Sequence, residues 1–205
     1  MTGPKVATPD LVWYAAYGSN LCRNRFVRYL EGGLVPNSDG VVQTGARDPA
    51  PPLTDRPYEI DRLLYFAGAS KTWGNGGVAY LDADKRPGEP ALGRLWLITG
   101  QQFEDVYRQE NRLPPEWSDA GGLEPSWRPL LGDGSAMPTD RPYGRLLLLD
   151  QVDDTPVITF TGLRRHLEPN PPHQSYLAII ARGIEEAWGL DAAGAGRYLA
   201  RVGEG

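Results

Sequence analysis

Strand-forming segments outnumber helical ones along this chain, and the two kinds do not alternate regularly. Runs of β-branched and aromatic residues bounded by Gly, Pro and Asp predict the strands, and apolar residues at helical spacing predict the helices. Regular alternation would indicate a doubly wound parallel sheet, so its absence favours an α+β fold with a mixed, barrel-like β-sheet and flanking helices. The expected strands are 11–16, 40–44, 58–67, 77–81, 91–98, 145–150 and 156–161, and the expected helices are 21–30, 100–110, 174–188 and 191–202.

The chain is long enough for one domain with a substantial core. It has 205 residues, of which 40% are hydrophobic and 23% are charged, a balance that is typical of a globular protein and not of a disordered one. We find no internal repeat and no break that would separate two domains. Residues 1–10 are therefore expected to form a flexible N-terminal tail, and residues 11–205 a single domain.

Charge and composition exclude several classes of function. The formal net charge of −5 argues against a nucleic-acid-binding surface. Cys22 is the only cysteine, so an internal disulfide is impossible. No apolar run approaches the length of a membrane span, and the first residues lack the apolar core of a secretory signal. We expect a cytoplasmic protein without a nucleic-acid or membrane partner, while the oligomeric state stays open.

The segment YAAYGSN, residues 14–20, begins as a strand and breaks directly before a helix. Gly18 lets another molecule approach the backbone closely, and Ser19 or Asn20 can cap the helix. The unpaired N–H groups of a first helical turn, together with the helix dipole, favour an anion there. An ordinary helix cap is the other interpretation. Ser19 is a poor candidate nucleophile, because the second glycine of the G-x-S-x-G motif is missing.

Cys22 together with His166 or His173 suggests a thiol nucleophile. Cys22 lies among apolar residues of an expected helix, however, and a buried inert thiol is the commoner outcome. Two separate histidines without paired cysteines do not form a recognisable metal site. We expect no metal and no cofactor.

The helix expected over residues 100–110 carries a carboxylate on its apolar face. Phe103, Val106 and Tyr107 stand at positions i, i+3 and i+4, and Glu110 occupies i+7 of the same face. A glutamate facing inward has its pKa raised by desolvation unless a cation pairs with it, which is how a general base is tuned. Alternatively, the carboxylate bends out to water at the helix end. Three further charged residues of this helix are expected to be solvated: Glu104, Asp105 and Arg108.

Two glycine-rich segments also have alternative interpretations. Gly76 and Gly77 open a strand after Trp73, and they either admit a ligand or form a tight hairpin turn. The Pro- and Gly-rich segment 111–144 is longer than most loops and is expected to be functional or mobile. Alternatively, it is a surface flap that Trp117 and Trp127 anchor.

In this order, the motifs resemble the γ-glutamylcyclotransferase superfamily over roughly residues 11–190. The resemblance implies that fold, with Glu110 as the catalytic residue and with a substrate cavity lined by the strand-to-helix loop. It also implies a substrate-binding set of Tyr17, Gly18, Ser19, Asn20, Leu21, Gly76, Gly77 and Tyr176. The other residues that carry the resemblance are Trp73, Val78, Ala79, Gly93, Trp96, Pro172, Ile180 and Gly183.

The activity implied by the resemblance is cofactor-independent cleavage of a small-molecule γ-glutamyl amide. The substrate's own α-amine attacks the amide carbonyl, and 5-oxoproline and a free amine are released with Glu110 as general acid and base. A non-catalytic module that binds a small molecule or peptide, and an amidase that uses water, are the alternatives. The long segment 111–144 and Asn111, which replaces a frequent glycine, depart from the pattern and bear on substrate identity. The run from Phe26 to Gly33 resembles a bacterial branch of the superfamily.

Overall fold

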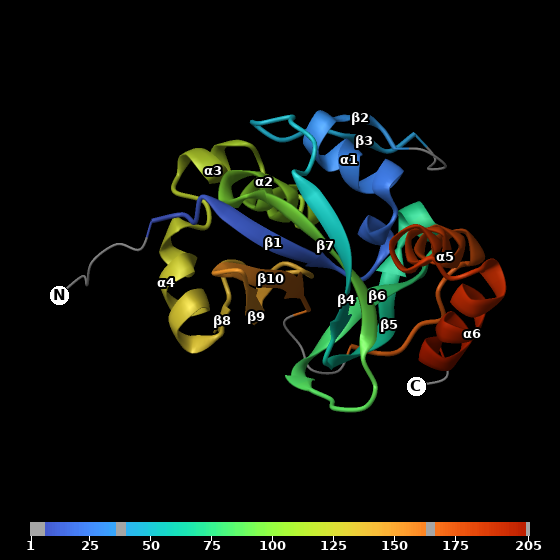
Figure 1. Ribbon diagram of the computed structural model, residues 1–205. Helices are drawn as coiled ribbons and strands as arrows, with labels where there is room; N and C mark the ends of the chain where they lie inside the picture. Colours follow the sequence, from blue (N-terminus) through green and yellow to red (C-terminus); the bar gives the residue numbers. More distant parts are fainter. Residues whose placement is uncertain (1–6, 36–39, 163–166, 204–205) are drawn as a thin grey trace.

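A computed structural model describes residues 7–35, 40–162 and 167–203 (Figure 1). Its main sheet has six strands in the order β4-β7-β1-β10-β9-β8, and a separate hairpin pairs β5 with β6. The pairing of β1 with β10 is parallel and the other pairs of the main sheet are antiparallel, so the expected α+β fold with a mixed sheet is confirmed. The strands are β1 (Leu11–Ala16), β2 (Gly33–Leu34), β3 (Val42–Gln43), β4 (Thr54–Ile60), β5 (Arg62–Ser70), β6 (Gly76–Lys85), β7 (Ala91–Thr99), β8 (Ser135–Ala136), β9 (Arg145–Val152) and β10 (Thr155–Thr161).

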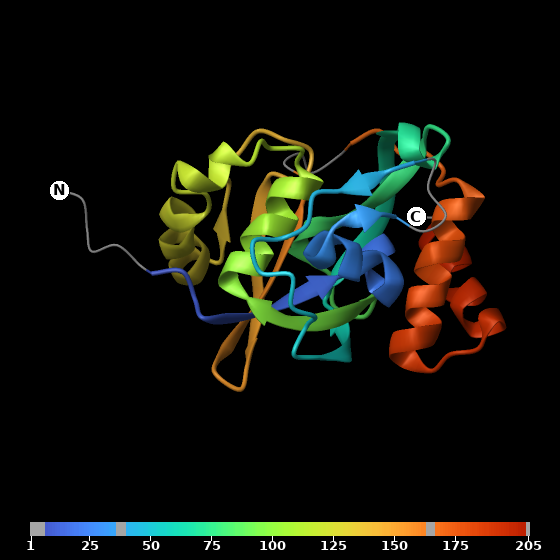
Figure 2. The ribbon, with the colours of Figure 1, turned by 90° about the horizontal axis from the view of Figure 1, so that it is seen from above.

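Helices cover the sheet from two sides. In Figures 1 and 2, α2, α3 and α4 lie to one side of β1, whereas α5 and α6 lie beyond the β5–β6 hairpin on the other. The helices are α1 (Arg23–Glu31), α2 (Gly100–Glu110), α3 (Glu116–Asp119), α4 (Glu124–Asp133), α5 (Gln174–Trp188) and α6 (Ala192–Gly203), with short 3₁₀ turns η1 (Ser19–Leu21) and η2 (Lys71–Trp73). None of the described helices is both long and apolar enough to cross a membrane.

Strand β1 divides the hydrophobic interior into two cores. Its side chains point alternately to the two faces of the sheet. Val12 and Tyr14 enter a core with α1, α2 and α4, while Trp13 and Ala15 enter a core with the β5–β6 hairpin, α5 and α6. Both faces are thus covered, which explains why the sequence of β1 is apolar without alternation.

The expectation of a barrel-like sheet is wrong, because the sheet stays open. Its edge strands, β4 and β8, do not pair with each other. The β5–β6 hairpin meets the sheet through a side chain: Thr161 of β10 accepts the N–H of Leu81 at 2.9 Å and donates to its C=O at 2.8 Å. These backbone groups of β6 are therefore satisfied without a strand partner.

Three expected elements differ from the structure. The strand expected over 58–67 is two strands, β4 and β5, which belong to different sheets and meet at Asp61. No Gly or Pro marks that break, and Asp61 and Arg62 are the only interruption of the apolar pattern there. The helix expected from residue 21 begins as η1 and is interrupted at Cys22, whose backbone is extended. The segment expected to be a loop over 111–144 contains α3, α4 and β8.

Helix α5 approaches η1 closely at Gly183. A Cβ atom at this position would overlap the Leu21 side chain and lie 2.5 Å from the backbone nitrogen of Cys22. The absence of a side chain therefore lets α5 pack directly on η1.

We expect Gly183→Ala to lower Tm by about 5 °C or more, because overpacking by one methyl costs roughly 1–3 kcal/mol when the neighbours are backbone. Gly196→Ala in α6 is the matched control, since its Cβ would meet nothing within 4 Å. That variant should gain about 1–3 °C from helix propensity alone. Thermal melting of both variants checks the prediction, and equal gains would contradict it.

Candidate functional site

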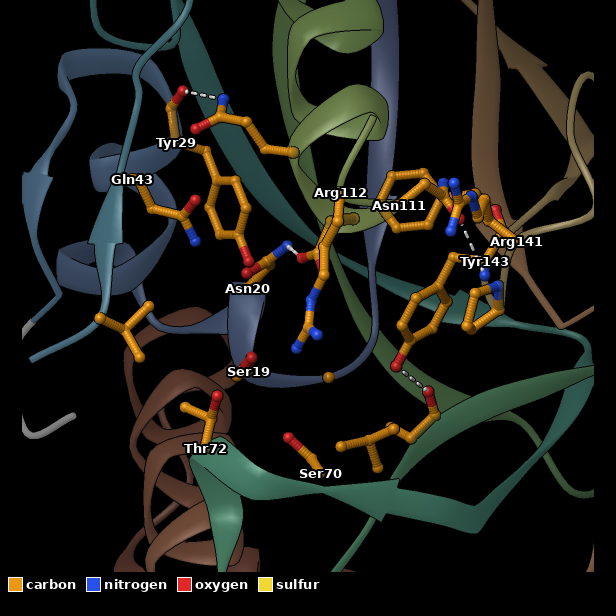
Figure 3. A pocket seen from close by; sticks show the side chains of 18 of the residues that line it. Ser19, Asn20, Tyr29, Gln43, Ser70, Thr72, Asn111, Arg112, Arg141 and Tyr143 are labelled. Carbon is orange, nitrogen blue, oxygen red and sulfur yellow. Dashed lines mark hydrogen bonds between the residues drawn. The ribbon is translucent and has the colours of Figure 1, made fainter. Parts of the chain in front are cut away.

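A cavity of about 720 Å³ lies where β1 ends (Figure 3). Segments that are far apart in sequence form its wall: the loop after β1, one face of α1, the β2–β3 region, the start of β6 and the end of α2. Among the candidate site residues from the sequence, six line it: Tyr17, Gly18, Ser19, Asn20, Glu110 and Tyr176.

Glu110 enters the cavity because helix α2 is fixed by its apolar face. Phe103, Val106 and Tyr107 are fully buried, so the next residue on that face points towards the cavity wall. Asn20 Nδ2 donates a hydrogen bond to Glu110 Oε1 at 2.8 Å and a second to the Tyr14 hydroxyl at 3.2 Å. The loop after β1 and the end of α2 are thereby joined by one side-chain amide.

The expectation that Glu104, Asp105 and Arg108 are solvated is wrong. All three are buried, with 6%, 1% and 7% of their surface exposed. Arg47 forms ion pairs with both carboxylates, with Nη2 at 2.9 Å from Glu104 and Nε at 3.0 Å from Asp105. Periodicity within α2 could not show this, because Arg47 belongs to a loop more than fifty residues earlier.

The loop after β1 does not cap α1 with its side chains. Cys22 is the N-cap of α1 and makes no side-chain cap bond. The Ser19 hydroxyl instead accepts a hydrogen bond from Arg25 Nε at 2.7 Å, and Asn20 binds Glu110. Both side chains therefore organise the cavity wall, and the capping interpretation is wrong.

Gly18 is pressed against Tyr176. A Cβ atom at Gly18 would lie 2.9 Å from the Tyr176 hydroxyl and 3.3 Å from the Cβ of Ala79. The same hydroxyl accepts the N–H of Ala79 at 3.1 Å. The space beside Gly18, which the sequence suggested for a ligand, is therefore occupied by the Tyr176 side chain in this structure.

Leu21, Gly76 and Gly77 are not among the described residues that line the cavity. Leu21 is fully buried beneath α5. A Cβ at Gly77 would overlap the carbonyl oxygen of Asn170, and one at Gly76 would lie 2.5 Å from the backbone nitrogen of His173. The close approach at these two glycines is therefore made by the segment before α5. The interpretation that they admit a ligand is wrong.

Burial raises the pKa of all six tyrosines that line the cavity, to about 12 for Tyr80 and Tyr176. The negative charge of Glu110 raises the pKa of every one except Tyr17 further. Their hydroxyls are protonated at neutral pH, so they can donate hydrogen bonds but cannot serve as bases. Glu110 is the one carboxylate among the described lining residues.

Sequence reasoning missed several residues of this cavity. Arg25 and Tyr29 enter it from α1, one helical turn apart, and the Arg25 Nη2 lies 3.3 Å from the Tyr29 hydroxyl. Burial lowers the pKa of Arg25, but the electrostatic interactions with Tyr29 and Glu110 outweigh that effect and raise it. Helical spacing after Asn20 could have indicated both residues.

Only the two ends of segment 112–143 line the cavity. Arg112 to Pro114 follow Glu110 directly, and Arg141 to Tyr143 return to the same wall. Between them, Trp127 is fully buried against Phe103. The middle of the segment is therefore part of the core around α2, and the interpretation as a surface flap is wrong.

The cysteine and histidines do not form a site in the described structure. Cys22 is 4% exposed, and burial followed by the charge of Glu186 raises the pKa of its thiol. His173 caps α5 by accepting the N–H of Ser175, while His166 lies outside the described residues. Within the described ranges, no three His, Cys, Asp or Glu side chains gather as metal ligands.

Comparisons with known proteins give three findings. No family model matches the chain. A curated relative, Histone deacetylase 5 of Arabidopsis thaliana, is 31% identical over 202 residues, which cover 92% of this chain and 30% of that protein. The chain thus spans about a third of the relative's length, and the relative's name describes a much longer protein.

Two solved structures are similar along nearly the whole chain. One is named Gamma-glutamyl cyclotransferase, with a TM-score of 0.49, 16% identity, and coverage of 93% of this chain and 88% of that one. The other is described as an uncharacterized protein from Homo sapiens, with a TM-score of 0.49, 17% identity, and coverage of 95% and 88%. Similarity at this level does not define an activity, because one fold hosts many functions.

The contact between Gly18 and Tyr176 predicts non-additive stability. Tyr176→Phe should cost about 1–3 kcal/mol, because the buried N–H of Ala79 loses its acceptor. Gly18→Ala should also destabilise the fold, but its methyl fits the space that Tyr176→Phe vacates. Urea unfolding of the double variant should show a coupling of about 0.5–3 kcal/mol. Additive losses would refute this contact.

Burial of Cys22 predicts an unreactive thiol. Iodoacetamide at pH 8 should leave the native protein unmodified for hours and label it fully in guanidinium, because the attacking species is the thiolate. Mass spectrometry measures the labelled fraction. Rapid labelling of the native protein would contradict the burial of this side chain.

Proposed function

We propose that this protein cyclises a γ-glutamyl amide, releasing 5-oxoproline and a free amine, with Glu110 transferring the proton. The hydrogen bond from Asn20 to Glu110 at the cavity wall is the observation that carries the proposal. It fixes the carboxylate at the cavity wall, where it can accept a proton from a bound ligand. The resemblance of the YGSN loop and of Glu110 to the cyclotransferase motifs supports the same assignment.

The reaction balances within the substrate. The α-amine nitrogen forms a bond to the amide carbon, and the bond from that carbon to the departing nitrogen breaks. In going from ammonium to lactam N–H the α-nitrogen loses two protons, and in going from amide N–H to ammonium the departing nitrogen gains two. Glu110 carries protons from the first nitrogen to the second. No electron is gained or lost, so these residues supply all that the chemistry requires.

The energetics suit a carboxylate base. Between model compounds, transfer of a proton from an α-ammonium with a pKa of about 8 to a glutamate side chain with a pKa of about 4.3 is uphill by roughly 5 kcal/mol. Attack within one molecule has an effective concentration of about 10⁵–10⁸ M, worth roughly 7–11 kcal/mol. The intramolecular advantage therefore exceeds the cost of the proton transfer, provided that the protein holds the substrate curled.

The cavity's hydroxyls and amides would hold that curled conformation. Tyr176 accepts the N–H of Ala79, so its own proton is available to the ligand. Tyr17 donates its proton to the carbonyl of Phe160 at 2.7 Å, so it can offer the ligand only a lone pair. The backbone amides of the Gly18–Asn20 loop would bind the substrate's carboxylate or the developing oxyanion.

Glu110→Gln tests the proposal, because glutamine keeps the shape and can still accept the Asn20 hydrogen bond but cannot take up a proton. We expect 5-oxoproline release to fall by about 10⁴-fold or more, since one group serves both proton transfers. Tm should change by less than about 3 °C. Glu89→Gln, at an exposed turn outside the cavity, is the control and should change neither quantity.

The assay uses a panel of γ-glutamyl amines, γ-glutamyl amino acids and γ-glutamyl peptides, and it detects 5-oxoproline and glutamate separately. Full activity of Glu110→Gln would refute the mechanism. Glutamate in place of 5-oxoproline would indicate an amidase. Tight binding without turnover by the wild type would indicate a binding module.

A further inference from the structure

Helix α2 ends on an arginine in a conformation that usually requires glycine. The N–H of Leu113 bonds to the carbonyl of Arg108 at 2.9 Å, and the N–H of Arg112 bonds to the carbonyl of Gln109 at 3.1 Å. This pair of bonds is a Schellman motif with Arg112 at its left-handed position, where φ is 52°. Glycine is favoured there because a Cβ atom is strained at positive φ.

The Arg112 side chain extends into the cavity. Figure 3 shows it reaching from the end of α2 into the space between Asn20 and Tyr143. No carboxylate of the described residues lies within ion-pair distance of its guanidinium. The neighbouring cation on α2 differs, because Arg108 contacts Thr44 and Asp105. Arg112 therefore has donors to offer a ligand.

The charge of the cavity opposes that of the chain. The chain has a net charge of −5, yet among the described residues the charged ones that line the cavity are one glutamate and four arginines: Glu110, Arg25, Arg108, Arg112 and Arg141. Such a cavity favours an anionic ligand. A guanidinium also matches the planar geometry of a carboxylate and can bind it through two parallel hydrogen bonds.

We propose that Arg112 binds a carboxylate on the departing amine and thereby selects γ-glutamyl amides of acidic amines. This assignment rests on the proposed function. Glu110 is half-buried and Arg112 is exposed, so the reacting centre lies deeper than the guanidinium. The departing amine must leave towards solvent, and so it is the part of the substrate closest to Arg112. A glycine at position 112 would relieve the backbone strain, but it would also remove the side chain that we propose selects the substrate.

Two substrates that differ by a single carboxylate test this role: γ-glutamyl-alanine and γ-glutamyl-ethylamide. The wild type should prefer the first in kcat/KM. Arg112→Gly should reduce that preference by about 10–100-fold, mainly through KM, since a hydrogen-bonded charge pair is lost. Its Tm should rise by about 2–4 °C, because the strain at positive φ is relieved.

Asp153→Gly is the matched control. Asp153 also has a positive φ, of 49°, but it lies in the exposed turn between β9 and β10, away from the cavity. That variant should keep the wild-type preference. An unchanged preference in Arg112→Gly would overturn the proposal, as would equal losses for both substrates.

Failure of the proposed function has a different outcome. If the wild type turns over neither amide, both serve as binding probes in calorimetry. Tighter binding of γ-glutamyl-alanine that is lost in Arg112→Gly would support the role of Arg112 without catalysis. Binding of neither amide, or equal binding by wild type and variant, would refute it.

Discussion

Strand β1 has to be covered on both faces, and most of the architecture follows from that demand. Its side chains pack into two hydrophobic cores. One core includes α1, α2 and α4, and the other includes the β5–β6 hairpin, α5 and α6. The coverage ends where the strand ends. Beyond Ala16 the chain turns at Gly18, and the two sets of covering elements diverge around a cavity. The cavity is thus a consequence of how the buried strand terminates.

The site joins parts of the chain that belong to rigid elements. Asn20 is held in the turn that packs under α5, and Glu110 is the last residue of a helix whose apolar face is fully buried. A hydrogen bond between two such residues is positioned before any ligand arrives, which is the condition for effective electrostatic catalysis. Arg112 follows two residues later, so one helix end carries both the proposed base and the proposed selecting cation.

Local patterns predicted the elements that are regular along the sequence. Helix α2 has the expected bounds because Phe103, Val106 and Tyr107 repeat at helical spacing, and the same spacing indicated Glu110. That the β5–β6 hairpin forms a separate sheet could not be predicted, because Thr161 satisfies backbone groups of a strand eighty residues away. The role of Arg47 was missed for the same reason, since it arises only from contacts distant in sequence.

An open sheet has two edges, and each edge strand is a potential template for pairing with another chain. At one edge, β8 is only two residues long and offers little to pair with. At the other, β4 contains Pro57, which has no N–H to donate to an added strand. The same two features that keep this sheet from growing therefore also protect the protein from edge-to-edge aggregation.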